Sequence, residues 1–149
     1  MTDILKVKPE GEILEELIRL SAEWEREGIT HGLRANTAED MREPCFIARV
    51  GGLIAGYAFG HFYEKETRNS FIEIGSRCFE LDELYVRPEY RGQGIGRELF
   101  RAIEGEAKGA DYMTLSAATK DWHRILKFYA DDMGMTFHSA YLIKPLEDE

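Results

Sequence analysis

The sequence predicts a mixed α/β fold, of the α+β kind, and three observations support this prediction. Runs rich in β-branched and aromatic residues come early in the chain and are joined by turn residues. Later in the chain, strand-like runs alternate with segments of helical periodicity. The length of 149 residues, with 44% hydrophobic and 32% charged side chains, fits one globular domain. We therefore predict a single domain over residues 1–149, built as a mixed sheet with helices on its faces.

The first predicted elements are a strand and a helix. Residues 3–8 alternate weakly between polar and apolar side chains, and Pro9 ends this strand. Apolar residues then recur every three or four positions, which predicts a helix over residues 13–27 that stops at Gly28. The next two segments are a loop over residues 28–36 and a short helix over residues 37–43, capped by Thr37.

A β-hairpin is the strongest turn signal in the sequence. Two β-rich runs, residues 45–50 and 53–62, flank Gly51-Gly52, and paired glycines suit a tight hairpin turn. Two further runs, residues 71–74 and 78–86, are also strand-like. The middle of the chain therefore supplies most of the predicted sheet.

Helices and strands alternate in the last third of the chain. We predict a helix over residues 94–108, a strand over 112–117, a helix over 123–132 and a last strand or strand pair over 135–143. In the first of these helices, Leu99, Ile103 and Ala107 recur at i, i+4 and i+8 and are predicted to form its buried face.

Composition and charge narrow the function classes. The net charge of −9 argues against nucleic acid as a partner, because a nucleic-acid-binding protein is expected to carry a basic patch. No apolar run approaches the ~20 residues of a membrane span, and residues 1–6 lack the features of a signal peptide. Cys45 and Cys78 lack the spacing of a zinc site or disulfide scaffold. We expect a cytoplasmic protein with no metal and no membrane partner.

A glycine-rich turn is the most informative motif. It reads Arg91-Gly92-Gln93-Gly94-Ile95-Gly96-Arg97, shortly after the strand-like Leu84-Tyr85-Val86 and before a helical pattern. Such a turn lets backbone N–H groups converge on an anion at a helix N-terminus. The motif lacks the Lys-Ser or Lys-Thr of a P-loop, and its glycine spacing differs from the dinucleotide fingerprint. Four arginines and two glutamates from Arg87 to Arg101 make the segment locally cationic, so it predicts a pyrophosphate-binding turn.

Residues Leu84 to Arg97 resemble the central motif of the GNAT superfamily of acetyl-CoA-dependent N-acetyltransferases. The family's pattern of Arg or Gln, two variable residues, Gly, one variable residue, and Gly or Ala falls on Arg91, Gly94 and Gly96. The order of predicted elements also fits over essentially the whole chain. The resemblance implies a GNAT-like acyl-CoA N-acyltransferase fold, with a central, mostly antiparallel sheet flanked by helices.

The resemblance also implies a reaction. Acetyl-CoA would be the cosubstrate, and the acceptor would be a primary amine of a small molecule or a protein, acetylated by direct attack in a ternary complex. The backbone of Leu84, Tyr85 and Val86 would bind the pantetheine arm, and residues 92–97 would wrap the pyrophosphate. Cofactor contacts around residues 121–124 and a homodimer remain open, and the alternative is a non-catalytic module that binds or senses acyl-CoA.

Two residues are candidates for catalysis. A strict period of two places Phe79, Leu81, Glu83 and Tyr85 on one face of their strand, so Glu83 would be partly desolvated and is the candidate general base. By resemblance, Tyr129 is the candidate acid that protonates the departing thiolate; a Glu that points to solvent and a Tyr in the core are the respective structural alternatives. Candidate acceptor-lining residues are Trp24, His31 and Tyr141, although residues of these types more often have a core or surface role.

Overall fold

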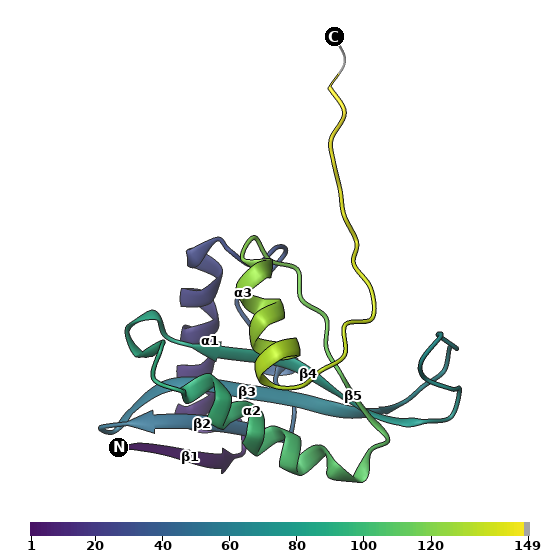
Figure 1. Cartoon of the computed structure of the whole chain (residues 1–149). Coiled ribbons are helices and arrows are strands. Elements are labelled where there is room, and N and C mark those ends of the chain that lie inside the picture. Colours follow the sequence, from purple (N-terminus) through teal and green to yellow (C-terminus); the bar gives the residue numbers. More distant parts are fainter. Residues whose placement is uncertain (148–149) are drawn as a thin grey trace.

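A computed structural model of the chain, which describes residues 1–147, is built on one five-stranded sheet. The strands lie in the order β1 (Thr2–Val7), β2 (Cys45–Val50), β3 (Leu53–Glu64), β4 (Arg77–Val86) and β5 (Tyr112–Thr114). The first four strands pair antiparallel, and β5 pairs parallel with β4 (Figure 1). The predicted mixed, mostly antiparallel sheet is confirmed.

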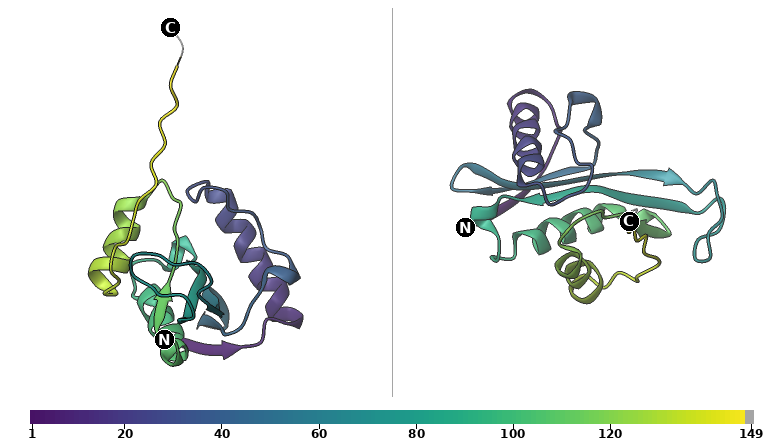
Figure 2. Two further views of the ribbon diagram at one scale, coloured as in Figure 1. Left: turned by 90° about the vertical axis from the view of Figure 1, so that its right-hand side faces the viewer. Right: turned by 90° about the horizontal axis from the view of Figure 1, so that it is seen from above.

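Helices cover both faces of the sheet. Helix α1 (Gly11–Glu27) lies on one face, and α2 (Ile95–Glu106) and α3 (Trp122–Leu126) lie on the other (Figure 2). The α1 side of the core contains Leu17 and Leu20, and the α2 side contains the fully buried Leu99 and Ile103. The predicted buried face of α2 is confirmed, as are the hairpin at residues 51–52 and the end of α1 before Gly28.

A β-bulge in β4 overturns one predicted face assignment. Phe59 of β3 pairs with Glu83, whereas the next residue, Gly60, pairs with Leu81, so Asp82 is an extra residue in β4. The alternation of faces changes at this point. Leu81 therefore packs on the α2 side while Tyr85 packs on the α1 side, where Glu83 contacts Tyr57.

Several predicted segments differ from the structure. Residues 71–74 form turns rather than a strand, β5 stops at Thr114, and residues 37–43 contain only the short 3₁₀ helix Ala38–Asp40. The helix predicted over residues 123–132 is the short α3 followed by a π-helical segment, Lys127–Asp132. Residues 135–143 form no strand, and after Met135, which packs against the core, the chain runs away from the sheet (Figure 1). Residues 71–74 and 135–143 have no neighbouring strand with which to pair within the described chain.

Gly60 fixes the close approach of β3 and β4 beside the bulge. A Cβ at this position would collide with the Glu80 carbonyl oxygen and the Phe79 ring. Because Phe79 is fully buried, neither group has room to retreat. We expect Gly60→Ala to lower the free energy of unfolding by about 1–3 kcal/mol, measured by urea denaturation. A variant as stable as the wild type would show that this contact is easily relieved.

Candidate active site

A cleft opens where β4 and β5 separate. The two strands pair only at Cys78–Glu80 with Tyr112–Thr114, and beyond these residues β4 has no strand partner on that edge within the described chain. The cleft has a volume of about 720 Å³ and is lined by residues 81–86 of β4 and by residues 115–119, which follow β5. Unpaired backbone N–H and C=O groups of β4 are therefore available to an extended ligand.

The glycine-rich turn closes one end of this cleft. Gly94 is the residue before α2, and its φ of +85° lies in the left-handed region that glycine adopts readily. The next three residues begin the helix, so their N–H groups have no acceptor within it and the positive end of the helix dipole faces the cleft. A Cβ at Gly94 would meet no protein atom within 4 Å, so its conformation rather than a contact within the protein requires glycine.

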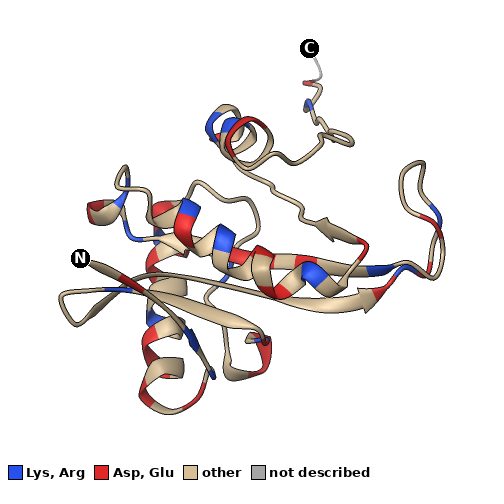
Figure 3. Cartoon of the chain, turned by 60° about the horizontal axis from the view of Figure 1, so that its bottom comes forward, with Lys and Arg blue, Asp and Glu red and all other residues tan. Residues whose placement is uncertain are grey.

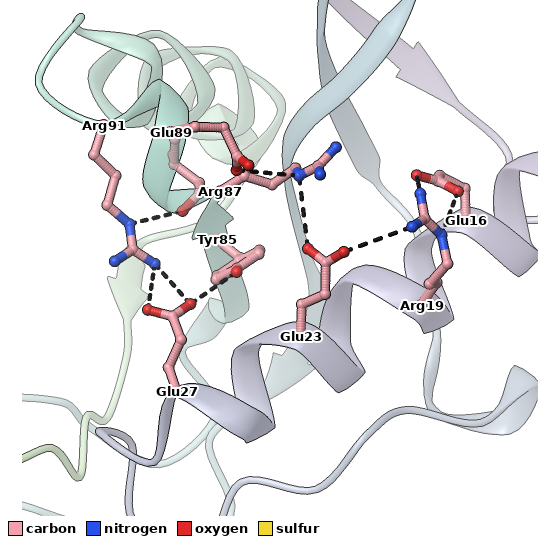
Figure 4. Close-up of polar contacts among 9 residues, drawn as sticks. Glu16, Arg19, Glu23, Glu27, Tyr85, Arg87, Glu89 and Arg91 are labelled. Carbon is pink, nitrogen blue, oxygen red and sulfur yellow. Dashed lines mark hydrogen bonds and ion pairs between the residues drawn. The ribbon is translucent and has the colours of Figure 1, made fainter.

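Acidic residues outnumber basic ones along α1 (Figure 3). Two of its glutamates pair with arginines beside the glycine-rich turn (Figure 4). The Arg91 guanidinium pairs with Glu27 at 2.9 Å and donates to the Val86 carbonyl oxygen at 2.8 Å. Arg87 lies 3.6 Å from Glu23. The expectation of a locally cationic segment is therefore wrong for most of its arginines, since only Arg97 makes no ion pair with a described residue.

The candidate base is held by hydrogen bonds from two other elements. Tyr57 donates its hydroxyl to Glu83 Oε1 at 2.7 Å, and the Asn36 amide donates to the same oxygen at 2.9 Å. Burial raises the pKa of Glu83, and the two hydrogen bonds oppose this rise. The second carboxylate oxygen is free of side-chain partners among the described residues, so it is available to accept a proton.

Tyr129 lies on the opposite wall. It belongs to the π-helical segment after α3, packs against Phe100 and lines the cleft. Burial raises the pKa of the Tyr129 hydroxyl to about 12. The hydroxyl therefore carries its proton at neutral pH, and burial makes it a weaker acid than an exposed tyrosine.

The cysteines are buried away from this chemistry. Cys45 and Cys78 are free thiols with no exposed surface, and neither lines the cleft. Burial raises the pKa of Cys45 to about 12, so the reactive thiolate is scarce at neutral pH.

The cleft brings together most residues that the sequence singled out. Those that line it are Glu83, Tyr129, Leu84, Tyr85, Val86, Arg91, Gly92, Gly94, Ile95, Gly96, Arg97 and Trp24. Gln93 is exposed outside the lining, His31 does not contribute to it, and Tyr141 lies on the extended C-terminal segment. Asn36 and Tyr57 were missed, since no local pattern relates them to Glu83.

No helix in residues 1–147 has the length and apolar character needed to cross a membrane.

One cluster of potential metal ligands occurs within residues 1–147. His61, Glu80 and Asp82 have side-chain atoms close enough to share an ion, but Arg42 already lies 3.8 Å from Asp82. A nearby guanidinium opposes a cation, so this cluster does not support a metal site.

The sequence matches the model of the Acetyltransferase (GNAT) family over residues 11–135. The chain belongs to this family. Its curated relatives include the thialysine N-epsilon-acetyltransferase of Bos taurus, 29% identical over 128 residues that cover 76% of this chain and 71% of the relative. The Caenorhabditis elegans enzyme of the same name is 25% identical over 130 residues, covering 82% of this chain and 75% of the relative.

Solved structures of GNAT proteins share the fold. An aminoglycoside N-acetyltransferase in complex with CoA superposes with a TM-score of 0.69 at 19% identity, over 99% of this chain and 96% of the other. A ribosomal-protein-alanine N-acetyltransferase from Brucella melitensis gives a TM-score of 0.66 at 20% identity, over 97% and 99%. The predicted GNAT fold is confirmed.

Proposed function

We propose that this GNAT protein transfers the acetyl group of acetyl-CoA to a primary amine by direct attack within a ternary complex. The observation that carries the proposal is that one cleft brings together the free edge of β4, the N-terminus of α2, the Glu83 carboxylate and the Tyr129 hydroxyl. Relatives named as N-acetyltransferases support the same reaction class.

The residues of the cleft fit acetyl-CoA. The cleft has a volume of about 720 Å³, which lies within the range of small-molecule sites. The backbone of residues 84–86 offers an unpaired edge for the pantetheine arm, although Arg91 already occupies the Val86 carbonyl oxygen. The N–H groups at the start of α2 and the Arg97 side chain face the space for the pyrophosphate.

Glu83 and Tyr129 would move the protons. An amine with a pKa near 10.4 costs about 4–5 kcal/mol to hold neutral at pH 7, and Glu83 would offset part of this cost by accepting its proton, directly or through a water. Acetyl-CoA supplies the thioester carbonyl, at which the nitrogen–carbon bond forms as the carbon–sulfur bond breaks. Tyr129 would then donate its proton to the departing sulfur.

Thermal melts with acetyl-CoA, CoA, ATP and NAD test the cosubstrate. A ligand at 100 times its Kd adds about 2.7 kcal/mol to the stability. For a chain of 149 residues this corresponds to roughly 5–10 °C. We expect acetyl-CoA and CoA alone to give this shift, followed by acetylation in an amine screen. Stabilisation by ATP or NAD would contradict the proposal, whereas CoA binding without turnover of any amine would favour the non-catalytic sensing module.

We also propose that the chain forms a homodimer through residues 135–147. Residues 135–143 have the composition of a strand, and beyond His138, which contacts Ser70, the extended segment leaves the body (Figure 2). Tyr141 and Leu142 are 89% and 90% exposed. Within the described chain no strand pairs with the outer edge of β5. Reciprocal exchange with a second copy would give both the segment and this edge a partner.

Light scattering of the full-length protein tests the dimer. We expect a dimer mass for the wild type and a monomer mass for the double variant Tyr141→Asp/Ile143→Asp, because the added carboxylates oppose burial. Leu53→Asp is the control, since Leu53 is 57% exposed at the start of β3, next to the hairpin turn and away from this segment. A wild type that stays monomeric at its highest soluble concentration would refute the exchange.

A further inference from the structure

The carboxylates that line the cleft differ in whether a basic side chain of the protein already pairs with them, and this difference bears on the acceptor. Among residues 1–147, five acidic side chains contribute to the lining, namely Glu27, Asp82, Glu83, Asp121 and Asp132. Four of them are already paired with a basic side chain of the protein. Glu83 is the exception among the described residues, because its partners are the neutral Tyr57 and Asn36.

The four paired carboxylates are distributed around the cleft. Their partners are Arg91 for Glu27 at 2.9 Å, His61 and Arg42 for Asp82 at 2.8 and 3.8 Å, Arg124 for Asp121 at 3.7 Å, and Lys127 for Asp132 at 3.3 Å. A cationic ligand group at any of them would compete with a basic side chain that the carboxylate already contacts. The net charge of −9 therefore does not translate into an acidic acceptor site.

Apolar side chains bound the cleft on the α1 side of β4. Trp24 stacks on Tyr85 with ring centroids 5.0 Å apart, and its indole N–H donates a hydrogen bond to the Thr30 hydroxyl oxygen at 3.1 Å. Ile29 and Leu33 line the cleft from the loop that follows α1. The same loop ends at Asn36, whose amide donates to Glu83, so one loop supplies both these apolar side chains and a partner of the carboxylate.

We infer that the acceptor is a primary monoamine on an apolar body, rather than a polyamine or a polyamino sugar. The inference rests on the proposed function. One ammonium group finds one unpaired carboxylate at Glu83, and the carbon chain behind it packs against Trp24, Ile29 and Leu33. A second ammonium on the same ligand would be held against this wall without a counter-charge, which is strongly unfavourable.

A matched pair of amines tests the inference. Hexylamine and hexamethylenediamine have the same chain length and differ by one terminal amino group. We expect kcat/KM with acetyl-CoA at neutral pH to be at least tenfold higher for hexylamine. An equal or higher value for the diamine would overturn the inference while leaving the acetyltransferase activity in place.

Substitutions in the wall provide the second measurement. Leu33→Asp adds a carboxylate where the second ammonium would lie, so the preference for hexylamine should fall by at least tenfold; Ile29→Asp serves the same purpose if that variant does not fold. Leu53→Asp adds the same charge at the start of β3, outside the cleft lining, and should leave the preference unchanged. A preference that Leu33→Asp and Ile29→Asp leave unmoved would also overturn the inference. If other amines of the screen are acetylated but hexylamine is not, the inference is overturned while the proposed function stands. If acetyl-CoA binds but no amine of the screen is acetylated, the proposed function itself fails, and the acceptor class with it.

Discussion

Replacing Glu83 by glutamine is expected to lower kcat/KM for the amine by about 10²- to 10⁴-fold, the usual contribution of a general base. Glutamine keeps a carbonyl oxygen that can accept the hydrogen bonds from Tyr57 and Asn36, so the site should keep its shape. The measurement is steady-state kinetics with acetyl-CoA near saturation. Wild-type rates in Glu83→Gln would mean that another group, or water alone, removes the proton.

The pH profile separates the base from a purely structural role. Burial raises the pKa of Glu83 from its ordinary value of 4.5, so wild-type kcat/KM should fall as the pH decreases through this raised pKa. The decline attributable to Glu83 should be absent in Glu83→Gln, leaving only the dependence due to the amine itself. An identical low-pH limb in both proteins would contradict the assignment.

The stability of Glu83→Gln is the control for folding. A carboxyl whose pKa is higher in the folded than in the unfolded state destabilises the fold when it ionises. This cost is absent below the unfolded pKa, grows as the pH rises and is complete above the folded pKa. Glutamine does not ionise, so the Tm of the variant at pH 7 should equal or exceed that of the wild type.

A companion variant, Tyr129→Phe, should lower kcat by about 10²-fold with little change in KM for acetyl-CoA.

Replacing Gly94 by valine is expected to weaken acetyl-CoA binding by at least about tenfold. The φ of +85° at Gly94 is costly for any residue with a Cβ and most costly for a β-branched one. Relaxation of this strain would turn the first N–H groups of α2 away from the cleft. Because about 1.4 kcal/mol corresponds to a tenfold change in Kd, even partial distortion should be measurable by titration calorimetry.

Gly105 provides the matched control within the same helix. It lies in the last turn of α2, has no positive φ, and a Cβ there would meet no atom within 4 Å. Gly105→Ala should therefore leave acetyl-CoA affinity unchanged and raise stability by up to about 1 kcal/mol. Equal affinities for wild type and Gly94→Val would show that the turn does not hold the pyrophosphate.

Local patterns determined much of this protein. The glycine-rich turn, the hairpin at residues 51–52, the amphipathic helices and the family were all readable, because each depends on residues close together in the sequence. The same locality explains the failures. Residues 71–74 and 135–143 have strand-like composition, but a strand needs a neighbouring strand to pair with. The composition of a segment does not determine whether such a neighbour lies beside it in the fold.

The tertiary structure alone decided the electrostatics of the site. The bulge at Asp82 places Glu83 and Leu81 on opposite faces, which a strict period of two cannot anticipate. Asn36 and Tyr57 reach Glu83 from 47 and 26 positions away in the sequence, and α1 carries Glu27 to Arg91 across 64 positions. Charge pairing depends on distances of a few ångströms in space, so the sequence revealed which charges exist, and only the fold decided which one is left for a ligand.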